Sequence, residues 1–105
     1  MNTILRTEAF DLWLKKLKEA RGKARIVERI RSSERNQFGD CVPVGHGVSE
    51  MRIHFGPGYR VYFTRIRDLV YVLLYGGTKR GQQRDVAKAQ EMAKLMVEEW
   101  KDDQT

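Results

Sequence analysis

The sequence predicts an α+β fold with two N-terminal helices, an antiparallel β-sheet of about four strands and a C-terminal helix. Apolar residues recur at helical spacing over residues 7–33 and 82–100. They instead alternate along residues 41–76, where glycine-containing turns separate the runs. A chain of 105 residues is large enough for one modest hydrophobic core. We therefore expect a single domain over residues 1–105.

The first helix is expected from residue 7 to about residue 20. Thr7 is suited to cap its N-terminus, and Glu8 lies favourably in its first turn. Its apolar residues recur at i, i+3, i+4 and i+7 and are Phe10, Trp13, Leu14 and Leu17. Gly22 is expected to end this helix. Residues 1–6 precede it and contain two adjacent aliphatic side chains, so they can form a short strand.

A second helix is expected over about residues 23–33. Its apolar side is formed by Ile26, Val27 and Ile30. Another side carries Arg21, Arg25 and Arg29 at four-residue spacing. This arginine stripe indicates a solvated helix face. The second interpretation is a contact with RNA phosphates, because phosphate binding requires only a row of positively charged side chains.

The central segment is expected to form an antiparallel meander with strands near 41–45, 48–55, 59–66 and 69–76. Side-chain parity places Met51 and Ile53 on one face of the second strand, and Arg52 and His54 on the other. A three-residue loop at 56–58 would place His54 opposite Arg60. The last strand is apolar on both faces, which predicts a central or doubly covered position.

The final helix is expected from about Gln82 to Trp100. Its buried stripe is expected to comprise Val86, Ala89, Ala93, Met96, Val97 and Trp100.

Composition limits the classes of function. The net charge is +6, which favours a polyanionic target or an acidic protein partner. The single cysteine cannot form an internal disulfide, and no Cys/His cluster has metal-ligand spacing. No apolar run is long enough to cross a membrane, and the N-terminus lacks a signal-peptide pattern. We therefore expect a cytoplasmic protein with no membrane partner, metal site or cofactor.

Several ordered motifs are similar to those of a known protein family. They are residues 36–40 (NQFGD), 45–53 (GHGVSEMRI), 56–63 (GPGYRVYF), 76–79 (GGTK) and 83–86 (QRDV). With this order and spacing, the chain resembles the RelE/ParE superfamily of bacterial toxins, and more closely its HigB-like branch of addiction-module killer proteins. The resemblance runs through nearly the whole chain. It implies a small sheet with two N-terminal helices and one C-terminal helix.

The resemblance also implies a function. Nuclease members of the family cleave messenger RNA in the ribosomal decoding site and are neutralised by a co-encoded antitoxin, often a helix-turn-helix protein. The expectation is thus the toxin of a type II toxin–antitoxin module, acting as a metal-independent, ribosome-dependent mRNA endonuclease. One alternative is a toxin that binds DNA gyrase without cleaving RNA, as in the ParE branch. Another is a catalytically inactive chain that only binds the antitoxin.

The candidate catalytic residues are Arg60, His54, Lys79 and Tyr62. By resemblance, the family's sheet arginine corresponds to Arg60, and its basic residue after the last strand corresponds to Lys79 or Arg80. Arginine binds phosphate oxygens through a fixed fork of donors and stays charged, so Arg60 suits stabilisation of the phosphorane.

Proton transfer has several candidates. His54 can act as a base near neutral pH, and Tyr62 and Lys79 are alternatives for proton transfer or substrate stacking. The sequence has Gln82 and Gln83 where the best-studied nucleases carry a tyrosine, which leaves the general base open. The candidate RNA-binding residues are Arg52, Arg80 and His46; His46 also suits a simple turn between two glycines.

Overall fold

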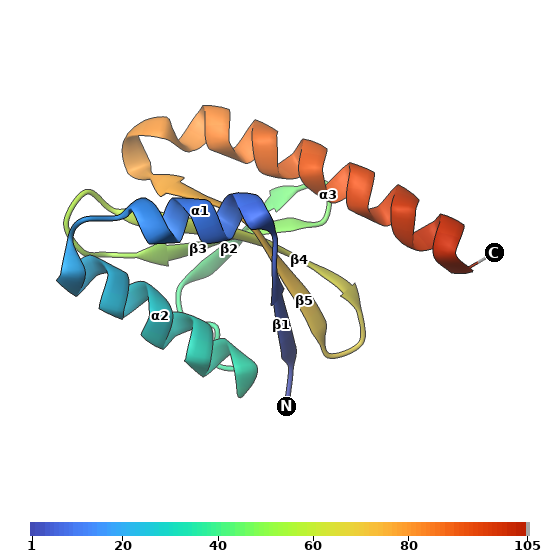
Figure 1. Cartoon of the computed structure of the whole chain (residues 1–105), viewed down its shortest axis with the longest axis horizontal. Helices are drawn as coiled ribbons and strands as arrows, with labels where there is room; N and C mark the ends of the chain where they lie inside the picture. The colour runs from blue at the N-terminus through green and yellow to red at the C-terminus, as the bar shows by residue number, and fades with distance from the viewer. Residues whose placement is uncertain (105) are drawn as a thin grey trace.

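The computed structural model describes residues 1–104, with side chains described through residue 99. Its elements are β1 (Thr3–Arg6), α1 (Glu8–Lys16), α2 (Ala20–Glu34), β2 (Cys41–Gly45), β3 (Val48–Ile53), β4 (Tyr59–Arg67), β5 (Val70–Thr78), the 3₁₀ turn η1 (Lys79–Gly81) and α3 (Gln82–Gln104). The predicted α+β class is confirmed, and all three helices expected from the sequence are present in the described chain (Figure 1).

The sheet differs from the predicted one in strand number and direction. Over the described residues it has five strands in the order β1-β5-β4-β3-β2, rather than about four. The chain begins with a strand, because Thr3–Arg6 pairs in parallel with Val70–Leu73 of β5. All other pairs are antiparallel, so the sheet is mixed. The short strand considered for residues 1–6 is therefore present, and it joins the sheet through its pairing with β5.

Helices cover both faces of this sheet. One core joins Phe10 and Leu14 of α1 and Ile26 and Ile30 of α2 to the strands. The second core joins Ala89 and Ala93 of α3 to the opposite face, including Val48, Tyr62, Val72 and Leu74. Figure 1 shows α3 along the side of the sheet opposite α2. The face that carries Arg60 is therefore largely covered by α3 rather than solvated.

The helical hairpin turns earlier than the glycine pattern predicts. Helix α1 ends at Lys16, and Gly22 lies inside α2 rather than at the end of α1. A Cβ at Gly22 would lie 2.5 Å from a ring carbon of Tyr59. The glycine is thus needed for the close approach of α2 to β4, and not as a helix cap.

The β3–β4 register is shifted by two residues from the predicted one. Ile53 pairs with Tyr59 and Arg52 pairs with Arg60, whereas His54 lies beyond the paired residues. The connection spans residues 54–58, with positive φ at Gly56 and Gly58. Because a shift of two preserves parity, the predicted faces of β3 and β4 are correct although the predicted partners are wrong.

Helix α3 packs through a narrower stripe than the sequence predicts. Ala89 and Ala93 are buried, and Val86 and Met96 are partly buried. Val97 is exposed, contrary to the prediction. The helix continues to Gln104, and the side chain of Trp100 lies outside the described residues. No helix in the described chain is long and apolar enough to cross a membrane.

Candidate active site

The structure brings four of the predicted site residues to one hollow of about 530 Å³ at the β3–β4 loop. Arg52 comes from β3, His54 from the start of the loop, Arg60 from β4 and Lys79 from the first residue of η1. Gln82 at the start of α3 also lines the hollow. The pleat makes this possible, since Arg52 and Arg60 are cross-strand partners and point to the same face.

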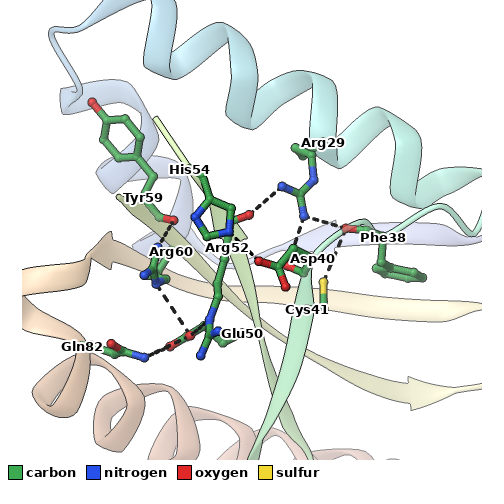
Figure 2. A network of polar contacts seen from close by, with 10 residues as sticks. All are labelled: Arg29, Phe38, Asp40, Cys41, Glu50, Arg52, His54, Tyr59, Arg60 and Gln82. Atoms are coloured by element: carbon green, nitrogen blue, oxygen red, sulfur yellow. Dashed lines mark hydrogen bonds and ion pairs between the residues drawn. The ribbon is translucent and has the colours of Figure 1, made fainter. Parts of the chain in front are cut away.

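Glu50 lies next to Arg52 and Arg60 and was not among the predicted site residues, although its place on the same strand face as Arg52 follows from the sequence (Figure 2). Its side chain is fully buried, and its carboxylate accepts hydrogen bonds from Arg52 Nε at 2.9 Å and from Gln82 Nε2 at 2.9 and 3.1 Å. The bond from Arg52 raises the pKa of that guanidinium, which therefore stays charged. Glu50 thus offsets the repulsion between two neighbouring arginines. In the sequence, this pairing is indicated by the two-residue spacing of Glu50 and Arg52, which places both side chains on the same face of a strand.

Arg60 is the most buried cation of the hollow, with a relative exposure of 5%. Its Nη1 donates to the carbonyl of Tyr59 at 3.2 Å, while its Nε lies 3.7 Å from Glu50 and has no hydrogen-bond partner among the described residues. Gly58 brings Arg60 and Lys79 together. Its carbonyl accepts from the Lys79 backbone N–H at 2.8 Å, and a Cβ there would lie 3.4 Å from Arg60 Nη1.

His54 is paired with Asp40, a second residue that the sequence did not single out as functional. His54 Nε2 lies 2.5 Å from Asp40 Oδ2, and the imidazole is largely exposed. The hydrogen bond with His54 lowers the pKa of Asp40, so this carboxylate is ionised at neutral pH. The Asp40 carboxylate can only accept a hydrogen bond, so Nε2–H of His54 is the donor and Nδ1 is the ring nitrogen left without this partner. The pairing therefore orients His54 as a potential base.

Arg29 of α2 holds the segment that carries Asp40. Its Nη1 donates to the carbonyl of Arg52 at 2.6 Å, and its Nη2 donates to the carbonyls of Phe38 at 2.8 Å and Asp40 at 3.3 Å. The neighbouring Arg25 places its guanidinium 4.6 Å from the ring centroid of Phe55, which lines the hollow. Arg29 is thus a structural support of the site, whereas Arg21 and Arg25 are exposed, as predicted for a solvated helix face.

Tyr62 does not reach the hollow. Its side chain is fully buried beneath α3, so its ring cannot stack on a substrate. Burial, assisted by the nearby Glu50 and Asp85 carboxylates, raises the pKa of Tyr62 far above its usual value. The phenol therefore stays protonated at neutral pH and cannot serve as a base. Its hydroxyl has no hydrogen-bond partner in the part of the chain that the structure describes.

Two candidate RNA-binding residues lie elsewhere. Arg80 lines a neighbouring hollow with Trp13 and Asp85. His46 occupies the β2–β3 turn with φ 55°, at the opposite end of β3, and faces α3. Its conformation between Gly45 and Gly47 fits the turn interpretation.

The chemistry of the hollow is that of an anion site. Guanidinium, ammonium and amide donors converge there, and a histidine stands at the rim. Within the described residues, no three His, Cys, Asp or Glu side chains are grouped as metal ligands.

Comparison with known proteins identifies one informative similarity. No family model matches the chain. The chain is 42% identical over 87 residues to an uncharacterized protein of Haemophilus influenzae. The matched region covers 83% of this chain and 88% of that protein.

Proposed function

We propose that this chain, which belongs to the same family as the uncharacterized protein of Haemophilus influenzae, is the toxin of a type II toxin–antitoxin module and cleaves messenger RNA on the ribosome. The observation that carries the proposal is the convergence of Arg52, His54, Arg60 and Lys79 on one hollow. The ordered motifs that resemble the RelE/ParE superfamily, and its HigB-like branch in particular, give the same assignment.

Arg60 is suited to bind the scissile phosphate. Its guanidinium lines the hollow, and its buried Nε faces Glu50, so an incoming anion would bind the part of the guanidinium that borders the hollow. Lys79 adds a positive charge at the rim, where its side chain is exposed. Together they would stabilise the charge that develops on the phosphorane, and the chain's own cations make a metal unnecessary for this role.

The His54–Asp40 pair is suited to begin the reaction. Nδ1 of His54 takes the proton of the ribose 2′-hydroxyl, and the 2′-oxygen attacks the adjacent phosphorus. The bond from phosphorus to the 5′-oxygen then breaks, which leaves a 2′,3′-cyclic phosphate and a 5′-hydroxyl. The 5′-oxygen receives its proton from Lys79 or from water. Asp40 holds the imidazole and offsets the charge it gains.

The partners follow from the same proposal. The net charge of +6 favours the ribosome, a polyanion, and an acidic segment of a cognate antitoxin. The antitoxin is expected to be a helix-turn-helix protein, by the resemblance to the HigB-like branch. The site of action is then the bacterial cytoplasm.

Induced expression in a bacterial host tests the function. Wild type should arrest growth and translation, and Arg60→Lys should relieve the arrest because it keeps the charge but loses the bidentate fork. Arg65→Ala is the matched control, since Arg65 lies on the same strand but is exposed and pairs with Asp68. Circular dichroism of each purified variant verifies folding.

Primer extension on messages from arrested cells identifies the target. New 5′ ends inside coding regions are expected from the wild type and not from Arg60→Lys. Intact messages with DNA damage would instead indicate a gyrase poison. If wild type has no effect on growth, the chain is an inactive antitoxin-binding component and the nuclease proposal is wrong.

A further inference from the structure

A second hollow, of about 640 Å³, lies along a part of β5 whose outer edge has no neighbouring strand among the described residues. β1 pairs with β5 only from Val70 to Leu73. The later part of β5, from Tyr75 to Thr78, lines the hollow instead. The hollow therefore occupies the place that a continuation of β1 would fill.

Thr7 closes the edge of β5 immediately before this hollow. Its backbone N–H donates to the carbonyl of Leu73 at 3.0 Å, and its hydroxyl donates to the carbonyl of Leu74 at 2.7 Å. The chain then enters α1 and no longer runs beside β5 as a strand. The open part of the edge thus begins after Leu74.

The register of β5 turns the backbone groups of Gly76 toward this open edge. The Lys79 N–H donates to the Gly58 carbonyl at 2.8 Å, and hydrogen-bonded pairs alternate along an antiparallel ladder. Gly77 therefore belongs to a hydrogen-bonded pair with Arg60, whereas Gly76 points its N–H and C=O away from β4. Gly76 is buried, and outside the ladder no described residue forms a hydrogen bond with its backbone. Buried backbone groups are nearly always paired, so Gly76 marks the place of a missing partner.

Side chains from both faces of the sheet border the hollow. A Cβ at Gly76 would lie 2.1 Å from a ring carbon of Trp13, and a Cβ at Gly77 would lie 2.0 Å from Asp85 Oδ2. Because successive strand residues face opposite sides of a sheet, the indole and the carboxylate lie on opposite faces of β5. An added strand meets both groups, since its own side chains alternate between the two faces.

The charged groups of the hollow indicate what such a strand carries. The Asp85 side chain is 9% exposed, and its ion pair with Arg84 spans 3.8 Å, beyond hydrogen-bonding distance. A buried carboxylate without a donor is costly, so this group favours an occupant that supplies one. Arg80 and Arg84 line the hollow and are exposed, which gives its entrance a positive charge. Acidic residues of an occupant complement that charge.

We propose that this hollow takes an extended, acidic segment of a partner protein, which adds to β5 as a strand beside Gly76. Backbone hydrogen bonds supply the affinity in this mode of recognition, and contacts of alternate side chains supply the specificity. The segment places an apolar side chain against Trp13, a hydrogen-bond donor against Asp85 and acidic side chains near Arg80 and Arg84. In the proposed module the cognate antitoxin provides this segment, an identification that rests on the proposed function.

NMR of the isotope-labelled protein tests strand addition without an identified partner. The probe is a synthetic capped hexapeptide of alternating valine and threonine with a glutamate at each end. At millimolar concentration it should shift the amide signal of Gly76 and the indole N–H signal of Trp13, and it should slow hydrogen exchange at Gly76. Two further peptides carry N-methyl groups on the valines or on the threonines. A strand points only every other N–H toward its neighbour, so one methylated peptide should lose binding and the other should keep it.

Charge reversal tests the acidic character of the occupant. Arg80→Glu combined with Arg84→Glu should weaken peptide binding by roughly 10-fold or more. Arg31→Glu combined with Arg35→Glu makes the same charge change at exposed positions of α2 and its C-terminal end, and should not weaken it. Equal affinities of the two double variants would overturn the acidic assignment.

The other contrary outcomes overturn strand addition itself. They are the absence of a shift at Gly76, and binding that is kept, or lost, in both methylated peptides. A 2′-O-methylated RNA hexamer that displaces the peptide from Gly76 would assign the hollow to nucleic acid, and the proposal would be wrong. None of these results touches the growth arrest by wild type and its relief by Arg60→Lys, which decide the ribonuclease proposal separately.

Discussion

The Nε of Arg60 lies 3.7 Å from Oε1 of Glu50, and both side chains are almost fully buried. This separation is too long for a hydrogen bond, so Glu50 attracts Arg60 without occupying its donor. The same carboxylate is hydrogen-bonded to Arg52 and Gln82. Glu50 thus stabilises two adjacent arginines and holds the guanidinium of Arg60 beside the hollow that it lines.

Removal of Glu50 is therefore expected to damage both fold and activity. Glu50→Ala leaves two cross-strand guanidiniums without their carboxylate and should lower the free energy of unfolding by about 3–5 kcal/mol. Glu50→Gln retains the shape and should cost less, yet it should still reduce RNA cleavage. Urea denaturation and growth arrest are the two measurements. Asp68→Asn, at an exposed ion pair, is the control, and a Glu50→Ala protein as stable as this control would contradict the role given to Glu50.

The pairing of Asp40 with His54 gives a pH-dependent prediction. The hydrogen bond lowers the pKa of Asp40 in the folded protein, so the pair adds stability above the ordinary pKa of aspartate and loses it as the pH falls through the lowered value. Asp40→Asn should accordingly be less stable than wild type at neutral pH, and the difference should vanish in acid. Thermal melting over a series of pH values measures this.

The same substitution should slow RNA cleavage by up to about 10²-fold, because His54 loses the group that orients it. Asp11→Asn is the control, since Asp11 pairs with Arg6 at an exposed position away from the site. If Asp40→Asn cleaves RNA at the wild-type rate, His54 is not oriented by Asp40 during the reaction.

Sequence periodicity predicts which face each strand residue occupies, but it does not predict the strand register or the contacts between distant segments. The faces of β3 and β4 follow from a two-residue period, which survives the register shift that separates His54 from Arg60. The register itself depends on a five-residue loop, which no periodicity specifies. Asp40 is 14 residues from His54, and its role arises only when Arg29 draws its segment against β3. In the sequence, Gly22 has the features of a residue that ends a helix. The structure shows that a glycine is needed there because α2 packs closely against Tyr59, a contact that local sequence does not indicate.

Arg29 should prove more important than its place in an arginine stripe suggests. Arg29→Ala removes the guanidinium that donates hydrogen bonds to the carbonyls of Phe38, Asp40 and Arg52. It should therefore destabilise the protein by about 2–3 kcal/mol and weaken RNA cleavage through Asp40. Arg21→Ala changes an exposed residue of the same stripe and should have little effect on either. Equal effects of the two substitutions on unfolding in urea would show that Arg29 is an ordinary surface residue.

Tyr62→Phe should leave the reaction intact. The hydroxyl is buried, stays protonated and has no hydrogen-bond partner among the described residues, so its removal takes away an unsatisfied polar group. Stability should be unchanged or higher by up to about 1 kcal/mol, and growth arrest should match wild type. A large loss of cleavage in a folded Tyr62→Phe protein would restore Tyr62 as a participant in the chemistry.

Asp85 provides a test that separates a functional carboxylate from a structural one. Burial raises its pKa in the folded protein, so its ionisation opposes folding and stability falls as the pH rises through the raised value. Asp85→Asn should therefore match wild type in acid and exceed it at neutral pH, with a melting temperature higher by roughly 1–4 °C. A carboxylate that weakens the fold at neutral pH would fit a group that is not present for stability. A lower melting temperature at neutral pH would instead show that Asp85 holds the structure together.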